Sequence, residues 1–228
     1  MSRSSEFHSK FAGGVQWRVT PAGVEVEGKG LLNCDAGMYQ VAEAFVKEHA
    51  AALAGASQEF EVPVEFLIAC ALTQSQGNPA RKFVWRDPGY VGDSSTPDRI
   101  STGVCRMLVS TAQFFMKDPA IDHFWLLDLG NALRACGAYV RHNHATLKTG
   151  WDPVLVACAF NAGGLYEDQS PGNVWRLKQY SMLLGFHGIA DARTPDHSYA
   201  TVFSQYFAAA RRAIDADLLK GCVRFPVD

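Results

Sequence analysis

Residues 63 to 74 read Pro63-Val64-Glu65-Phe66-Leu67-Ile68-Ala69-Cys70-Ala71-Leu72-Thr73-Gln74, and nearly every side chain in this run is apolar. Proline suits the first position of a helix, because the N–H that it lacks would have no intrahelical partner there. A helix that is apolar on all sides lies in the core of a protein. We therefore predict a central, buried helix that starts with Pro63 and places Gln74 at its C-terminal end, where a cleft would open.

Apolar residues also recur at helical spacing before and after this run. Further helices are expected over residues 37–58, 103–116, 128–147, 154–160 and 199–214. Residues 76–99 are rich in glycine, proline and aspartate and are expected to form a long irregular loop, a kind of segment that is often functional. A second irregular segment is expected over residues 164–197.

The N-terminal part of the chain has a different pattern. Residues 1–14 are polar and are expected to form a loose arm. Residues 15–19 and 24–27 alternate apolar and polar side chains around Thr20-Pro21-Ala22-Gly23, which predicts a small β-hairpin. Such a hairpin is too short to be stable alone, so we expect it to lie on the helical body. The fold is thus expected to be mainly α, with one small β element.

Composition excludes several classes of function. With 228 residues, 48% of them hydrophobic, the chain is large enough for one continuous core. The formal net charge is -2 and the basic residues are scattered, so nucleic acid is not an expected partner. The histidines show no metal-ligand spacing, since His142 and His144 fall on different faces of a helix. Neither a metal nor another cofactor is expected.

Targeting and redox state can also be anticipated. No apolar run is long enough to span a membrane, and the polar first residues do not resemble a secretory signal, so we expect synthesis in the cytoplasm and no membrane partner. The six cysteines are expected to stay reduced. Cys70, Cys136 and Cys158 lie in alanine-rich helical segments, where a thiol acts as a small buried hydrophobe.

Three short segments carry the residues that are candidates for chemistry. The first is Gln74-Ser75, the second is Ser101-Thr102-Gly103-Val104-Cys105-Arg106, and the third is Ala159-Phe160-Asn161-Ala162-Gly163-Gly164. In the third, an asparagine at a helix end can present its amide to the acetamido group of a sugar, while the glycines allow a tight turn.

In this order and spacing, the three segments resemble the lytic transglycosylases and goose-type lysozymes, which cut the glycan strands of peptidoglycan. The fingerprint of that family is Glu-Ser at the end of a helix, then Gly-Leu-Met-Gln, then Ala-Tyr-Asn-Ala-Gly. Here the third block is nearly intact, the second is half kept, and the first has Gln74 in place of the acid. The resemblance covers about residues 36–210. It implies a lysozyme-like helical domain over residues 36–228, with the arm and hairpin of residues 1–35 packed on it.

The resemblance also implies roles for particular residues. Gln74 stands at the position of the general acid/base that cleaves the bond between N-acetylmuramic acid and N-acetylglucosamine. The residues expected to bind substrate are Ser75, Arg106, Phe160, Asn161 and Tyr166. A carboxyl can give up a proton and take it back, whereas a neutral amide cannot, so the chain as written is expected to be inactive.

Three explanations for Gln74 remain open. The acid was replaced by design to trap substrate, or it was lost by drift, which also accounts for Arg106 and Phe160 where the family has glutamine and tyrosine. The third is that a neighbouring acid substitutes for it. The candidates for that acid are Asp87, Asp93, Asp98, Glu167 and Asp168.

Two classes of function follow. The first is a peptidoglycan-directed enzyme, or a descendant of one, that acts at the cell wall or periplasm. The second is a catalytically silent structural or glycan-binding component of a phage tail or another envelope-penetrating assembly. Glycan strands are the expected partner in the first case, and virion or secretion-machine proteins in the second.

Overall fold

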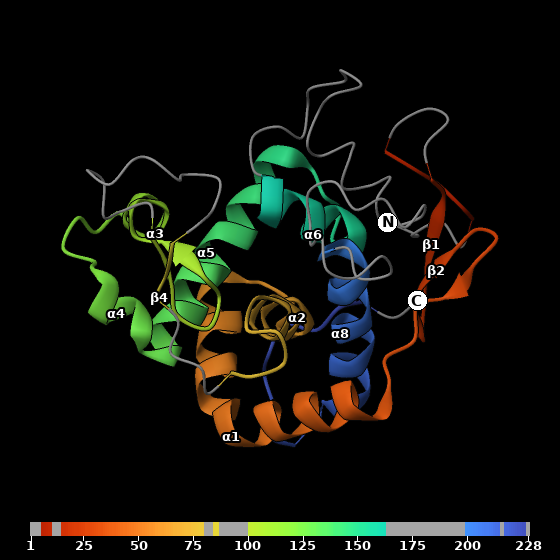
Figure 1. Cartoon of the computed structure of the whole chain (residues 1–228), viewed down its shortest axis with the longest axis horizontal. Coiled ribbons are helices and arrows are strands. Elements are labelled where there is room, and N and C mark those ends of the chain that lie inside the picture. The colour runs from red at the N-terminus through yellow and green to blue at the C-terminus, as the bar shows by residue number, and fades with distance from the viewer. Residues whose placement is uncertain are drawn as a thin grey trace.

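The computed structural model describes residues 6–10, 15–79, 84–86, 100–162, 199–214 and 217–226. This part of the chain is mainly helical (Figure 1). The helices are α1 (Ala36–Phe60), α2 (Val64–Gln74), α3 (Val109–Met116), α4 (His123–Leu127), α5 (Leu129–Leu147), α6 (Pro153–Ala162) and α8 (Tyr199–Ala213). The strands are β1 (Trp17–Thr20), β2 (Gly23–Val26), β3 (Gly30–Leu31), β4 (Val84–Arg86), β5 (Ile100–Thr102) and β6 (Met107–Leu108).

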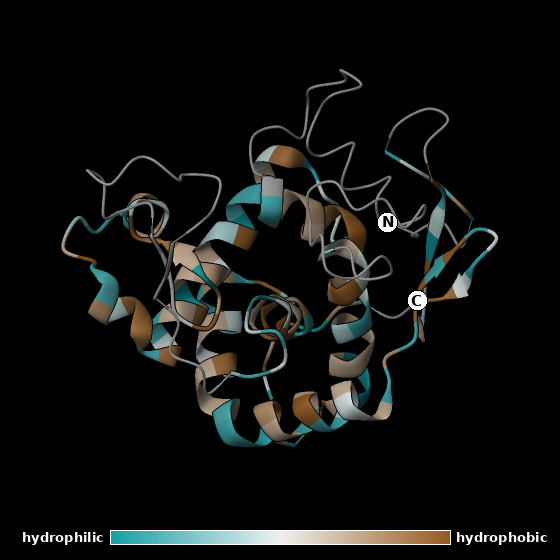
Figure 2. Cartoon of the chain, viewed as in Figure 1, coloured by the Kyte–Doolittle hydropathy of each residue, from teal (hydrophilic) through white to brown (hydrophobic). Residues whose placement is uncertain are grey.

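Helix α2 is the centre of the fold. It is packed against α1, α5, α6 and α8, and Figure 1 shows it end-on with these helices around it. All residues from Val64 to Thr73 are buried, and Figure 2 shows how apolar this helix is. The predicted central helix is therefore confirmed, with Gln74 as its last residue. It begins one residue later than expected, because Pro63 caps the helix and the Val64 N–H donates to the Val223 carbonyl at 2.9 Å.

The other long helices are also confirmed, with bounds close to those predicted. Asp35 caps α1 by accepting from the Met38 N–H at 2.7 Å, and Asp128 caps α5 by accepting from the Asn131 N–H at 2.9 Å. Such caps satisfy the first N–H groups of a helix, which have no partner within it. None of the helices among the described residues is long and apolar enough to cross a membrane.

The predicted hairpin is confirmed as β1 and β2, which pair antiparallel, and β3 extends it to a small sheet. Strand β2 packs on α8, where Gly23 approaches so closely that an added Cβ would lie 3.1 Å from the Ala208 Cβ. The expectation of a loose arm is wrong for residues 6–10. His8 and Trp17 exchange two backbone hydrogen bonds of 2.9 Å, which place this segment beside β1.

A second small sheet, β4-β5-β6, was not predicted, and it corrects two expectations. Strand β4 lies within the segment expected to be an irregular loop, and α3 begins at Val109 instead of residue 103. Residues 103–106 form a turn, because Gly103 and Arg106 have positive φ angles of 78° and 47° and the Arg106 N–H donates to the Gly103 carbonyl. A helix cannot pass through two left-handed residues. Helix α4, capped by Asp122, was also missed.

The segment of residues 217–226 closes over the beginning of α2. Glu65 is only 1% exposed, and its carboxylate accepts from the Arg224 Nε at 3.0 Å and from the Phe225 N–H at 2.9 Å. The Ser57 hydroxyl accepts from the Val223 N–H and donates to the Val62 carbonyl. The Phe225 ring packs edge-on against Phe66 and Phe207. The start of the central helix is thus held by polar and apolar contacts together.

Candidate functional site

Gln74 lies at the C-terminal end of α2 and is partly exposed. Its side-chain amide donates a hydrogen bond of 3.3 Å to the hydroxyl of Tyr199, the first residue of α8. Burial raises the pKa of the Tyr199 phenol well above its ordinary value, so this partner is neutral at any ordinary pH. The contact therefore joins two neutral groups, and neither of them is suited to exchange protons with a substrate.

Ser75 follows Gln74 and ends the helix. It is fully buried, and its hydroxyl points back to the Leu72 carbonyl at 3.5 Å. In this conformation the hydroxyl contributes to the helix end, although the family resemblance gives it a role in binding substrate. The turn continues through Gln76 and Gly77, both with positive φ angles.

The second block forms the tight turn between β5 and β6. Gly103 is required there, since a Cβ on it would lie 2.0 Å from the Leu126 carbonyl oxygen. Arg106 is half-buried in this turn, and Cys105 beside it is fully buried. Cys136 of α5 and Cys70 of α2 are also fully buried.

The third block divides into a buried and an exposed part. Phe160 is 8% exposed and packs against the Tyr139 ring, with ring centroids 5.3 Å apart. This packing leaves little of the Phe160 ring for a ligand. Asn161, the next residue along α6, is exposed and can reach a ligand. Tyr166 lies outside the described residues, as do the five acids named as substitutes for Gln74.

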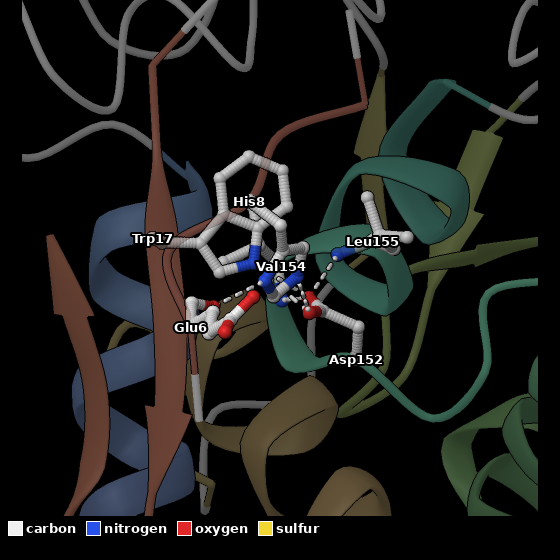
Figure 3. Close-up of polar contacts among 6 residues, drawn as sticks. All are labelled: Glu6, His8, Trp17, Asp152, Val154 and Leu155. Atoms are coloured by element: carbon white, nitrogen blue, oxygen red, sulfur yellow. Dashed lines mark hydrogen bonds and ion pairs between the residues drawn. The ribbon is translucent and has the colours of Figure 1, made fainter. Parts of the chain in front are cut away.

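A buried carboxylate fixes the beginning of α6 (Figure 3). The Asp152 side chain accepts from the Val154 N–H at 2.9 Å, from the Trp17 indole N–H at 2.9 Å and from the His8 Nε2 at 2.9 Å. The hydrogen bond from His8 raises the pKa of that imidazole above its ordinary value. Asp152 thus ties residues 6–10, β1 and α6 together, and the helix that it caps carries Asn161 at its other end.

Two features of this site were not found from the sequence. One is the partner of Gln74, because no local spacing connects Tyr199 with a residue 125 positions away. Asp152 precedes Pro153 at a helix start, a pattern typical of an N-cap, but nothing in that pattern points to His8 or Trp17.

Within the described residues, no group of three or more histidine, cysteine, aspartate or glutamate side chains is arranged to hold a metal ion. Comparison of the chain with models of known protein families and with curated proteins finds no match.

Proposed function

We propose that this chain is a peptidoglycan-directed, lysozyme-like protein of the lytic transglycosylase type, and that it is inactive with Gln74 in place of the general acid/base. Its ancestors would cleave the bond between N-acetylmuramic acid and N-acetylglucosamine. The chain would keep the scaffold for holding a glycan strand without the group that protonates the leaving oxygen.

The observation that carries this proposal is the contact between Gln74 and Tyr199. Glycoside cleavage of this type requires a carboxyl that donates a proton to the glycosidic oxygen. At the position where the resemblance implies that acid, the side chain is an amide, and its partner is a phenol with a raised pKa. An amide can position a sugar by hydrogen bonding, but it does not transfer protons at ordinary pH.

The arrangement of the helices supports the same proposal. The first block ends a buried central helix, α6 and α8 pack against that helix, and Asn161 is exposed on α6. These are the relations expected if the three sequence blocks serve one cleft. A cleft shared by the three blocks is part of the proposal.

A second candidate is a catalytically silent structural or glycan-binding component of a phage tail or another envelope-penetrating assembly. The packing of Phe160 favours it, because a side chain at a position that the resemblance assigns to the cleft is used here for the core. Its partners would be other virion or secretion-machine proteins, and glycan strands would be bound without being cut.

The substitution Gln74→Glu tests whether the scaffold is still competent. If only the acid is missing, the purified variant releases anhydro-muropeptides from isolated sacculi, detected by mass spectrometry, and clears a cell-wall suspension. Gln76→Glu is the matched control, because it makes the same chemical change at an exposed residue two positions further on. Both variants must first show the unfolding transition of the parent chain.

The results separate the two candidates. Products from the Gln74→Glu variant alone support descent from an enzyme whose cleft is intact. Anhydro-muropeptides released by the unaltered chain would refute the proposal that it is inactive, and they would indicate that another acid replaces the missing one. If a folded Gln74→Glu variant releases no muropeptides, binding of the chain to sacculi is measured next. Co-sedimentation of the unaltered chain with sacculi that is weakened by Asn161→Ala but not by Asn33→Ala, a change at another exposed asparagine, supports the glycan-binding component.

A further inference from the structure

Residues 6–10, which we call the strap, meet the body of the protein at His8 (Figure 3). The backbone of His8 exchanges two hydrogen bonds of 2.9 Å with Trp17 of β1, and the centroids of the two rings are 5.1 Å apart. The His8 Nε2 lies 2.9 Å from a carboxylate oxygen of Asp152, the residue before α6. One side chain of the strap therefore contacts both β1 and the beginning of α6.

Both nitrogens of the His8 ring face acceptors. Nε2 faces the Asp152 Oδ2, and Nδ1 faces the backbone carbonyl of Glu6 at 3.3 Å. Carboxylate and carbonyl oxygens only accept, so each ring nitrogen needs an N–H of its own. A neutral imidazole carries one N–H, whereas an imidazolium carries two. Only the protonated ring can therefore satisfy both contacts, and its positive charge also pairs with the Asp152 carboxylate.

We propose that the strap is a proton-operated clasp, closed on β1 and α6 while His8 is protonated and released from Trp17 and Asp152 when His8 loses that proton. The helical body stays folded in both states. The proton passes from Nδ1 to water or buffer, because the N–H on Nε2 keeps its bond to Asp152, and the side chain is 38% exposed to solvent. This inference does not depend on the proposed function.

The elements packed around His8 balance its charge through one carboxylate. From β1 the ring meets the neutral indole of Trp17, whose N–H donates to Asp152 at 2.9 Å. The charged residue that follows on β1, Arg18, is paired with Glu25 of β2 at 2.8 Å. From the beginning of α6 the group that faces the ring is the Asp152 carboxylate. The protonation state of His8 thus sets the strength of the contact with Asp152.

The strap can open without disturbing α6. The Val154 N–H at the start of α6 donates to the Asp152 Oδ1, whereas His8 contacts Oδ2, so the helix keeps its cap when the strap leaves. Ordering a short segment costs conformational entropy in every residue, so one strong contact has a large share in holding it closed. A hydrogen bond to a charged group is stronger than one between neutral groups, and its loss should raise the open fraction roughly tenfold.

The test is solvent exchange of the backbone N–H groups of His8 and Trp17, which form the two strap hydrogen bonds, measured by NMR on the full chain. Rates are compared at about pH 5.5 and about pH 8.5, on either side of the histidine titration, and divided by the intrinsic rate at each pH. Protection of both groups is expected to fall roughly tenfold at the higher pH, while that of the buried Leu72 N–H stays constant. Unchanged protection of the strap, or an equal fall at Leu72, would overturn the proposal.

The substitution Asp152→Asn makes the test specific. It keeps the oxygen that accepts from the Val154 and Leu155 N–H groups and places an NH₂ where Oδ2 faces His8. An NH₂ donates, so Nε2 must now accept, while the N–H on Nδ1 donates to the Glu6 carbonyl. The neutral ring then satisfies both contacts. Protection in this variant is expected to rise with pH, opposite to the parent chain, and a fall like that of the parent would refute the clasp.

A second variant covers the case in which Asp152→Asn does not fold. The buried Trp17 N–H retains an acceptor in Asp152→Asn, because it also reaches Oδ1 at 3.1 Å, and a cooperative unfolding transition checks that the variant is folded. His8→Gln leaves Asp152 in place and removes the titrating ring. Protection of the Trp17 N–H in His8→Gln is expected to be the same at both pH values. If the roughly tenfold change persists without the imidazole, His8 does not operate the strap.

Discussion

The two ends of helices α2 and α6 are held in opposite ways. At their beginnings stand buried carboxylates, Glu65 and Asp152, each with several hydrogen-bond donors. At their ends stand amides, Gln74 and Asn161, of which the first makes a long contact with a phenol and the second is exposed. The acids at the beginnings of these helices therefore stabilise the fold, whereas Gln74 and Asn161 at their ends carry no charge.

The largest effect is expected from the substitution Glu65→Ala. It removes the buried carboxylate that accepts from the Phe225 N–H and from the Arg224 Nε, so we expect a loss of about 3 kcal/mol in the free energy of unfolding, measured in urea. Glu59→Ala is the control, because Glu59 pairs with Arg134 at the surface and should cost less than about 1 kcal/mol. Equal losses for the two variants would refute the contrast between buried and exposed pairs.

A smaller loss is expected for Asp152→Ala. The variant loses the cap of α6 and leaves the indole N–H of the fully buried Trp17 without its acceptor, which together should cost about 2 kcal/mol. Asp128→Ala removes only an exposed cap, that of α5, and should cost about 1 kcal/mol. The difference in unfolding free energy between the two variants measures how much the hydrogen bond from Trp17 adds to the cap. Equal losses would show that only the cap contributes.

The pH dependence of stability tests the hydrogen bond between His8 and Asp152. The hydrogen bond with Asp152 raises the pKa of His8 above 6.5, so this contribution to stability is complete below pH 6.5 and is lost as the pH rises through the raised pKa. The groups that act on His8 are the Asp152 carboxylate and the Glu6 backbone carbonyl. His8→Gln should remove this part of the pH dependence, seen in urea unfolding at several pH values, and an unchanged profile would show that His8 is not its source.

The smallest loss of stability is expected at the C-terminal end of α2, where Gln74 contacts Tyr199. Tyr199→Phe removes one long hydrogen bond between neutral groups and should cost less than about 1 kcal/mol. A double-mutant cycle with Gln74→Ala should give a coupling energy of similarly small size. A coupling energy as large as the loss of unfolding free energy in Glu65→Ala would mean that Gln74 stabilises the fold. The two ends of α2 would then not differ in role.

Local pattern was sufficient for much of the fold. Apolar spacing predicted α1, α2, α5 and α8, and alternation predicted the β1–β2 hairpin, because these signals depend on neighbouring residues. The second sheet was missed since Gly103 and Arg106 adopt left-handed conformations inside a stretch with helical spacing. Only the packing of Gly103 against Leu126 reveals the need for that turn.

The site was predicted less completely, because its contacts are distant in sequence. The sequence places Gln74 at the end of the central helix, but it does not indicate Tyr199 as its partner. Phe160 was assigned to the substrate by resemblance, whereas its burial depends on Tyr139 of another helix. Likewise, a glutamate in an apolar run such as Glu65 gives no sign of the Arg224 and Phe225 groups that satisfy it.

The closure of residues 217–226 over α2 has a consequence for biosynthesis. The donors and acceptors that complete the beginning of this helix, at Val223, Arg224 and Phe225, leave the ribosome long after the helix itself. Until then the nascent chain holds a strongly apolar helix whose Glu65 carboxylate lacks these partners. Native docking of α2 therefore has to wait until residues 217–226 have been synthesised, and before that point its apolar surface is exposed to aggregation.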